Sequence, residues 1–232
     1  MSTQRPLCEV DMTTAAQASG IKRTVLFILA FMVFVVVSFV SRIFQPTILS
    51  PAEMQANGTM VFQQPRQLTD FSLIDHTGAA FNRDTVMGHW TLAFFGFTHC
   101  PDICPTTMAE LNQFMSLIEG TEIENGFRVV MVTVDPGRDT VEQLANYVPF
   151  FNSEFLGVTG EFLDIHRFAT ELNTPFRRVP GGGENYQMDH SANVVVINPR
   201  GDYHGFVKAP LDLTKMKLTL RSMVADWNRQ GF

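Results

Sequence analysis

An uncharged segment near the N-terminus constrains the fold of this chain more than any other feature. Between Arg23 and Arg42 lie 18 residues without a charge, TVLFILAFMVFVVVSFVS. An ordinary amphipathic helix would interrupt such a run with a polar face. The run is also just long enough to cross the hydrocarbon core of a bilayer as a helix. The sequence therefore predicts one membrane anchor at residues 24–41.

The charges on either side of this segment indicate its orientation. Arg5, Lys22 and Arg23 precede it, and only Arg42 closely follows it. Because basic residues stay preferentially in the cytoplasm, we expect residues 1–23 to form a cytoplasmic tail and the rest of the chain to be exported. A cleaved signal peptide is the competing interpretation, but the region before the apolar run is long, and no Ala-x-Ala-like site follows the run. We expect an uncleaved anchor.

The tail also bears on the compartment. It contains Glu9 and Asp11, whereas mitochondrial transit peptides are rich in arginine and poor in acidic residues. We therefore expect a single-pass protein of the bacterial inner membrane, with its C-terminal domain in the periplasm. The mitochondrial inner membrane, with the domain facing the intermembrane space, is the alternative.

Composition limits what the exported part can be. The net charge is −6 and no basic patch is evident, which argues against a nucleic-acid partner. Residues 42–67 contain prolines near both ends and no sustained hydrophobic period, so they are expected to form a stalk or linker. The remaining segment, residues 68–232, has a length that suits one domain with a single core.

Apolar runs and helical patterns alternate along this domain. The runs WTLAFFGFT, residues 90–98, and FRVVMVTV, residues 127–134, are typical of strands buried on both faces of a sheet. Further strands are expected at 155–158 and in hairpins over 71–81 and 193–207, and helices at 106–118, 139–147, 161–172 and 213–227. This order predicts an α/β sandwich with a mixed central sheet.

Two cysteines lie where the first buried strand gives way to a helix. Cys100 and Cys104 are each followed by proline, and Pro105 is tolerated only in the first turn of a helix. Both thiols should then project to the same side of a helix N-terminus, where the helix dipole lowers a thiol pKa. A thiolate is both a nucleophile and a metal ligand, so this pair could be redox-active or bind a metal. The third cysteine, Cys8, is expected to be a bystander.

A metal site would need more than the two thiols. Two thiolates suit Cu(I), and an imidazole can complete a three-coordinate site. The side chain of His99 should diverge from that of Cys100, whereas His190 precedes a buried strand in a glycine-rich loop, with Asp189 beside it. Loops at strand ends gather at one edge of such a sheet, so His190 could lie over the cysteines. The residues alone leave open whether it is a ligand or a surface histidine.

Three motifs together carry a family resemblance. GFTHCPDICPTTM, VTVDPGRDT and YQMDHSANVVVINPRG resemble the Sco (SenC) family of membrane-tethered copper chaperones for cytochrome c oxidase assembly. The resemblance implies a thioredoxin-like fold and copper, as Cu(I) or Cu(II), bound by Cys100, Cys104 and His190. It also links Asp135 to the copper site, and we expect Asp135 and Asp189 to support the ligands without binding the metal.

The resemblance further implies partners. The family delivers copper to the binuclear copper A centre of cytochrome c oxidase subunit II, and its members are proposed to reduce the cysteine pair of that subunit. Other copper chaperones or thioredoxin-like reductases are expected as additional partners. Whether the chain is also an enzyme, with Cys100 and Cys104 as its catalytic redox pair, stays open.

Two other kinds of function compete with copper delivery. One is a thioredoxin-like thiol–disulfide oxidoreductase acting on the cysteines of a periplasmic partner. The C-x-x-x-C spacing is one residue wider than the redox C-x-x-C motif, and Asp189-His190-Ser191 stands where such enzymes usually have a proline. The other is a binding or sensor module, which no sequence feature excludes.

Overall fold

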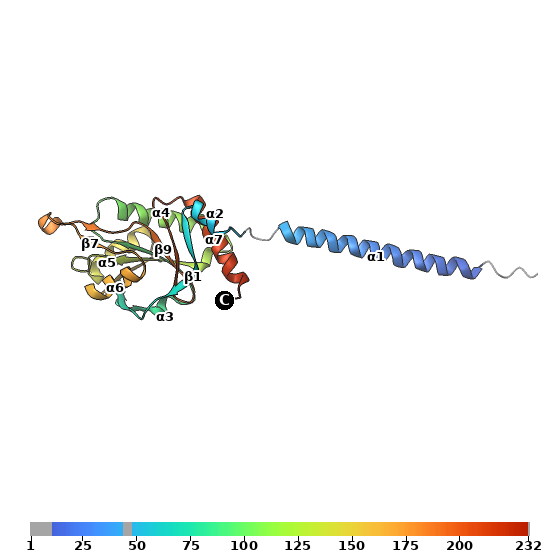
Figure 1. Ribbon diagram of the computed structural model, residues 1–232, viewed down its shortest axis with the longest axis horizontal. Helices are drawn as coiled ribbons and strands as arrows, with labels where there is room; N and C mark the ends of the chain where they lie inside the picture. Colours follow the sequence, from blue (N-terminus) through green and yellow to red (C-terminus); the bar gives the residue numbers. More distant parts are fainter. Residues whose placement is uncertain (1–10, 44–47, 232) are drawn as a thin grey trace, which may run out of the picture. The chain divides into compact units, whose positions relative to one another are not determined.

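The computed structural model describes residues 11–43 and 48–231 (Figure 1). Residues 1–10, with Cys8 and Arg5, lie outside the described residues. The chain divides into two compact units, Met1–Thr47 and Ile48–Phe232, and each is described by itself.

The described part of the first unit, residues 11–43, is one helix, α1, Asp11–Ile43. Within it, Lys22–Arg42 is long and apolar enough to cross a membrane, with a mean hydropathy of 2.8. The apolar side chains of this segment are exposed, from Val40 at 42% to Phe27 at 75%. A helix that is apolar on every side is stable only inside a protein core or in lipid. The predicted anchor at residues 24–41 therefore coincides with a candidate membrane span.

The second unit is built on an eight-stranded mixed sheet, which confirms the predicted α/β class. The strand order is β1-β10-β9-β4-β5-β6-β2-β3. The central strands β4, β5 and β6 are parallel, and the remaining neighbours pair antiparallel. The strands are β1 Thr59–Gln67, β2 Ser72–Asp75, β3 Ala80–Asn82, β4 Trp90–Gly96, β5 Phe127–Thr133, β6 Leu156–Thr159, β9 Val194–Ile197 and β10 Asp202–Val207, with a separate ribbon of β7 Arg177–Arg178 and β8 Met188–Asp189.

Helices cover both faces of this sheet. They are α2 Pro51–Ala56, α3 Arg83–Val86, α4 Ile103–Ile118, α5 Val141–Phe151, α6 Phe162–Glu171 and α7 Leu213–Arg229. Helix α4 contacts α5 and α7 on one face. On the other face, the ring of Phe95 packs 6.1 Å from that of Phe168 in α6. Figure 1 shows α4 and α7 on one side of the sheet and α6 on the other.

Strand β4 is the centre of the core. All seven of its residues are buried, and it pairs with β5 along its whole length. This follows from the unbroken apolar run, because a strand between two helical layers has no solvent face. The C-terminal ends of β4 and β5 consequently open at the same edge of the sheet, and the loops that follow them are neighbours.

The expected stalk at residues 42–67 differs most from the structure. Pro51–Ala56 is a short helix capped by Ser50, and Thr59–Gln67 is an edge strand paired with β10. The compact unit therefore begins at Ile48 rather than near Leu68. The alternating pattern of this strand was hidden by an irregularity in its pairing. A step of five positions on β1, from Val61 to Arg66, corresponds to a step of only two positions on β10. Proline is tolerated in such a bulge on an edge strand.

Candidate metal site

The cysteine loop connects the end of β4 to the start of α4. The N–H of Cys100 donates to the carbonyl of Phe97 at 3.2 Å, which turns the chain back toward the sheet. The side chain of Asp102, at the N-cap position of α4, makes no capping hydrogen bond. Instead the backbone N–H of Cys104 lies 3.4 Å from the sulfur of Cys100. The Cys100 thiol therefore fills the acceptor position that a capping side chain usually occupies.

Pro105 is in the first turn of α4, as the sequence predicted. The helix begins at Ile103, three residues earlier than expected, so Cys100 precedes the helix and Cys104 lies inside it. The two thiols are brought to the same side of the helix start. This is the arrangement that the proline pattern indicated.

His190 reaches this loop from the far end of the sequence. It follows β8 and precedes β9, and its Nε2 atom lies 3.6 Å from the sulfur of Cys104. Its Nδ1 atom lies 3.0 Å from the carbonyl oxygen of Ser191. Because a carbonyl only accepts, Nδ1 carries the ring proton and Nε2 presents its lone pair to the cysteine. Histidines that bind metals are typically oriented in this way by a carbonyl or carboxylate.

Burial sets the protonation of both groups. Cys104 is completely buried, and this burial raises the pKa of its thiol, with a further contribution from the hydrogen bond to Cys100. The prediction that the helix N-terminus lowers the thiol pKa is therefore wrong for Cys104, because desolvation outweighs the helix dipole. Burial also lowers the pKa of His190, against the opposing effects of the Ser191 carbonyl and the Asp189 charge. The imidazole is thus kept neutral, the form that binds metals.

Aromatic rings enclose this pair. The rings of Phe94 and Phe97 lie 6.1 and 5.9 Å from the His190 ring, both edge to face. Gly96 is required between them: a Cβ atom there would lie 2.7 Å from the Phe94 ring and 3.1 Å from the Cys104 sulfur. The phenylalanines that the sequence marked as core therefore form an apolar wall around the thiol.

The three predicted ligands do not yet converge. Among the described residues, no three His, Cys, Asp or Glu side chains lie close enough together to hold a metal as they stand. Cys104 and His190 already face each other, while the Cys100 sulfur is engaged with the backbone of α4. A three-ligand site therefore needs a side-chain rotation, most simply of the half-buried Cys100.

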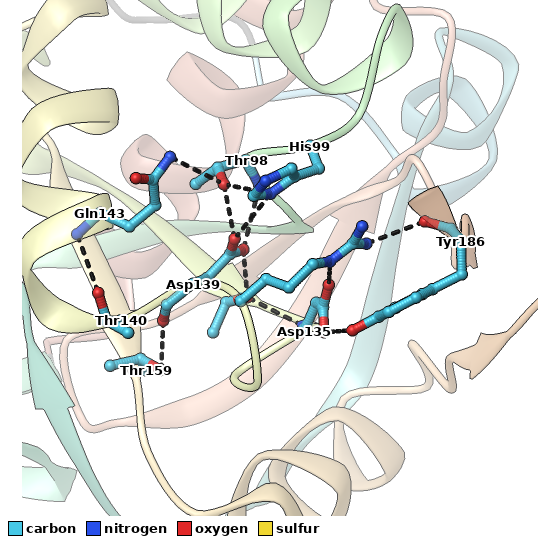
Figure 2. Close-up of polar contacts among 10 residues, drawn as sticks. Thr98, His99, Asp135, Asp139, Thr140, Gln143, Thr159 and Tyr186 are labelled. Atoms are coloured by element: carbon cyan, nitrogen blue, oxygen red, sulfur yellow. Dashed lines mark hydrogen bonds and ion pairs between the residues drawn. The ribbon is translucent and has the colours of Figure 1, made fainter. Parts of the chain in front are cut away.

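Asp139 holds the cysteine loop against the sheet (Figure 2). It is completely buried and accepts hydrogen bonds from the N–H of Thr98 at 3.0 Å and from the hydroxyls of Thr98 and Thr133, both at 2.6 Å. Burial raises its pKa, and these hydrogen bonds oppose the rise. The helix expected at 139–147 begins at Val141, and Thr140 caps it by accepting from the N–H of Gln143. An inward-facing carboxylate was not apparent from spacing.

Asp135 is linked to the histidine segment rather than to the metal ligands directly. It pairs with Arg138 and accepts a hydrogen bond from the hydroxyl of Tyr186 at 2.6 Å (Figure 2). Arg138 also donates to the Tyr186 carbonyl at 2.9 Å, and the guanidinium groups of Arg138 and Arg178 each lie 3.7 Å from the centre of the Tyr186 ring. Tyr186, which sequence analysis missed, therefore anchors the segment that carries His190.

The other candidates lie apart from the thiols. Asp189 is exposed and pairs with Arg177 at 3.1 Å, so its carboxylate is directed to the surface of the β7–β8 ribbon. His99 lies 3.1 Å from the hydroxyl of Thr98 and 3.8 Å from Asp139. His99 is thus directed to Asp139, and it lies in a turn whose closing bond runs from the N–H of Cys100 to the carbonyl of Phe97.

A small hollow gives access to the site. Its volume is about 270 Å³, and its lining includes Cys100, Ile103, Met188 and His190. A larger hollow of about 750 Å³ lies between β1 and α7 and contains no cysteine. We place the chemistry at the smaller one, because the thiols and the imidazole meet there.

Comparison with known proteins relates this arrangement to one family. The family model described as SCO1/SenC matches residues 61–225. A relative from Stutzerimonas stutzeri named "Putative copper-binding protein" is 33% identical over 166 residues, covering 72% of this chain and 80% of that protein. The human "Protein SCO2 homolog, mitochondrial" is 38% identical over 143 residues, which cover 59% of this chain and 53% of the human protein.

A solved structure shows the same fold. Arabidopsis thaliana ScoI, crystallised with copper bound, is 32% identical and superposes with a TM-score of 0.60, covering 70% of this chain and 98% of that one. The mixed sheet and its helices thus agree with the predicted thioredoxin-like sandwich.

Proposed function

Since the chain belongs to the SCO1/SenC family, we propose that it binds copper as cargo through Cys100, Cys104 and His190 and delivers it during cytochrome c oxidase assembly. The observation that carries this proposal is the 3.6 Å separation between the Cys104 sulfur and the Nε2 lone pair of His190. The copper-binding relatives and the copper-bound neighbour support the choice of metal.

The donor set fits copper. Two sulfurs and one neutral imidazole are soft to intermediate ligands that favour Cu(I), and the same set can also bind Cu(II). Cys104 and His190 are held by burial and by the Ser191 carbonyl, so they form the fixed part of the site. Metal binding displaces the proton of each thiol. The metal–sulfur bond offsets the cost of removing that proton, which the raised pKa of the Cys104 thiol increases.

Cys100 is the ligand that an acceptor protein replaces first when copper is transferred. It is only partly buried and lines the hollow beside Ile103, whereas Cys104 is inaccessible. A ligand from an acceptor protein can therefore approach copper on the Cys100 side while Cys104 and His190 still hold it. The acceptor is the binuclear copper A centre of cytochrome c oxidase subunit II, reached by a domain that α1 tethers to the outer face of the inner membrane.

A thiol–disulfide exchange role is the second candidate. It is favoured by the position of the Cys100 sulfur beside the N–H of Cys104, since the two thiols are close enough in the chain to form a disulfide. Cys100 would be the attacking thiol, because Cys104 is buried and its thiol pKa is raised. In that exchange the disulfide of the acceptor is reduced while Cys100 and Cys104 become a disulfide, so a thioredoxin-like reductase would have to reduce this pair again before it binds copper.

The decisive experiment measures copper bound per molecule. We would use the reduced full-length chain in detergent, with Cys8 replaced by serine in every sample, and a competing Cu(I) chelator. His190→Ala should weaken binding by at least tenfold. His99→Ala is the matched control, because His99 neighbours Cys100 in sequence but lies against Asp139, and it should bind copper like the parent.

The outcomes separate the two candidates. One copper in the parent and in the His99→Ala variant, lost in the His190→Ala variant, would support the three-ligand site. No copper in the parent, together with a readily reversible Cys100–Cys104 disulfide, would reject the proposal in favour of thiol exchange.

A further inference from the structure

Two buried hydroxyl groups have no hydrogen-bond partner among the described residues: those of Thr91 and Tyr147. An unpaired buried hydroxyl lowers stability, because its hydrogen bonds to water are lost and nothing replaces them. Thr91 lies at the start of β4, at the end opposite the cysteine loop. Tyr147 lies in α5, and its surroundings suggest a use for the unpaired group.

Helix α5 runs beside α4, which carries Cys104. Both helices follow parallel strands, so both start at the edge of the sheet where the cysteine loop lies. Near its start α5 contacts the cysteine loop, because Gln143 donates to the Thr98 hydroxyl at 3.4 Å, and at its end it contacts α4, because Asn152 donates to Asn112 at 2.8 Å. Figure 2 shows the first of these contacts, next to the cysteine loop.

Tyr147 lies between these two connections and on the same side of α5. It is four residues after Gln143 and four before Phe151, whose ring packs 5.2 Å from its own. Side chains on a helix lean toward its N-terminus, so the phenol of Tyr147 extends toward the end of α5 where the thiols are.

The charges that act on this phenol identify its neighbours. Burial raises the pKa of Tyr147, and Cys104, Cys100 and Asp139 raise it further when they are ionised, Cys104 most. The phenol therefore stays protonated at neutral pH. It can donate a hydrogen bond, and a negatively charged acceptor would strengthen that bond. Asp139 already accepts hydrogen bonds from Thr98 and Thr133, and the Cys100 sulfur lies beside the N–H of Cys104, which leaves the Cys104 sulfur as the candidate acceptor.

We propose that Tyr147 supports the copper site by donating a hydrogen bond from its hydroxyl to the Cys104 sulfur once that sulfur is a metal-bound thiolate. This inference rests on the proposed function. A neutral thiol is a poor acceptor, so the hydroxyl stays unpaired in the metal-free protein, and loss of the thiol proton on metal binding turns the sulfur into the acceptor that the hydroxyl lacks. Hydrogen bonds to a ligating cysteine sulfur tune both affinity and redox potential.

Tyr147→Phe tests this, because it removes only the hydroxyl and keeps the ring against Phe151. In the metal-free, reduced full-length chain, the thermal midpoint of the exported domain should stay the same or rise, since an unpaired group is lost. In the presence of a competing chelator, the Kd for Cu(I) should rise on the order of tenfold. In the Cu(II) form, the sulfur-to-copper charge-transfer band should shift, a readout that a purely structural role would not move.

Thr91→Val is the matched control. It removes the other unpaired hydroxyl, far from the thiols, so it should also preserve or raise the thermal midpoint while leaving the Kd and the absorption band unchanged. An unaltered Kd and band in Tyr147→Phe, with copper bound normally by the parent, would overturn the role of Tyr147 and leave the proposed function intact. A parent that binds no copper would overturn both.

Discussion

The hydroxyl of Tyr186 donates a hydrogen bond to Oδ1 of Asp135 at 2.6 Å, although 51 residues separate them. This bond joins the loop after β5 to the segment that carries His190. Arg138 reinforces it by pairing with Asp135 and stacking on the Tyr186 ring. The position of His190 therefore depends on contacts made four residues before it, outside the set of predicted ligands.

We predict that Tyr186→Phe weakens copper binding by about tenfold, because removing a contact that orients a metal ligand typically costs ten- to a hundredfold in affinity. The free energy of unfolding should fall by only about 1 kcal/mol, the usual value of one hydrogen bond. Chelator competition and chemical denaturation measure the two effects. A fall in the free energy of unfolding with unchanged copper affinity would mean that Tyr186 is a general stability residue and does not position His190.

We predict that Gly96→Ala displaces the Cys104 sulfur or the Phe94 ring. A Cβ atom there would lie 2.7 Å from the Phe94 ring and 3.1 Å from the Cys104 sulfur, so one of them must move. Overpacking of this kind costs about 1–3 kcal/mol. Denaturation should show this loss, and copper affinity should fall as well.

Gly126→Ala is a suitable control for that experiment, because nothing lies within 4 Å of the position where its Cβ would be. It should leave copper affinity unchanged. An unchanged affinity in Gly96→Ala as well would show that the site tolerates displacement of the Cys104 sulfur.

The sequence predicted the surroundings of the site well for a physical reason. The run from Trp90 to Thr98 could only be a central strand, and Pro105 restricted where a helix could start, so the position of the cysteine loop followed. The loop before β9 had to open at a sheet edge, and the structure brings His190 beside Cys104 there. The roles of these residues as copper ligands stay predictions.

Contacts between loops were not predictable in this way. Nothing in the spacing of Tyr186 or Asp139 reveals which partner each side chain meets, because those partners come from other segments. The raised pKa of Cys104 was missed because it depends on the burial of the thiol in the folded core, whereas the helix position was visible in the sequence. Strand β1 was missed because its bulge and Pro65 break the alternating pattern of burial.

The location of β1 leads to a prediction about the boundary of the domain. A chain that starts at Leu68 lacks the strand paired with β10, and it would expose that edge and the residues that β1 covers. Unpaired edges promote association between chains. We expect the segment 68–232 to be aggregated or unfolded and the segment 48–232 to be soluble and monomeric, as judged by size-exclusion chromatography and circular dichroism. Equivalent behaviour of the two segments would show that β1 is dispensable.

The last prediction concerns acid stability and a histidine far from the thiols. The His204 ring lies 5.0 Å from that of Trp90 and 5.9 Å from that of Trp227. Burial, with the nearby charge of Arg200, lowers the pKa of His204 to about 4, although Asp226 and Asp202 oppose the shift. In the unfolded chain its pKa returns to about 6.5, so the unfolded state binds the extra proton first.

Folding stability should therefore fall as the pH decreases from about 6.5 to about 4, and the contribution of His204 should level off below that range. The full loss from this group is about 3 kcal/mol, since each pKa unit corresponds to about 1.4 kcal/mol. His204→Phe keeps an aromatic ring between the tryptophans and removes the titration. In the metal-free, reduced chain, the free energy of unfolding of this variant should depend less on pH between 6.5 and 4 than that of the parent. If the two pH profiles run parallel, the proton that destabilises the fold binds elsewhere.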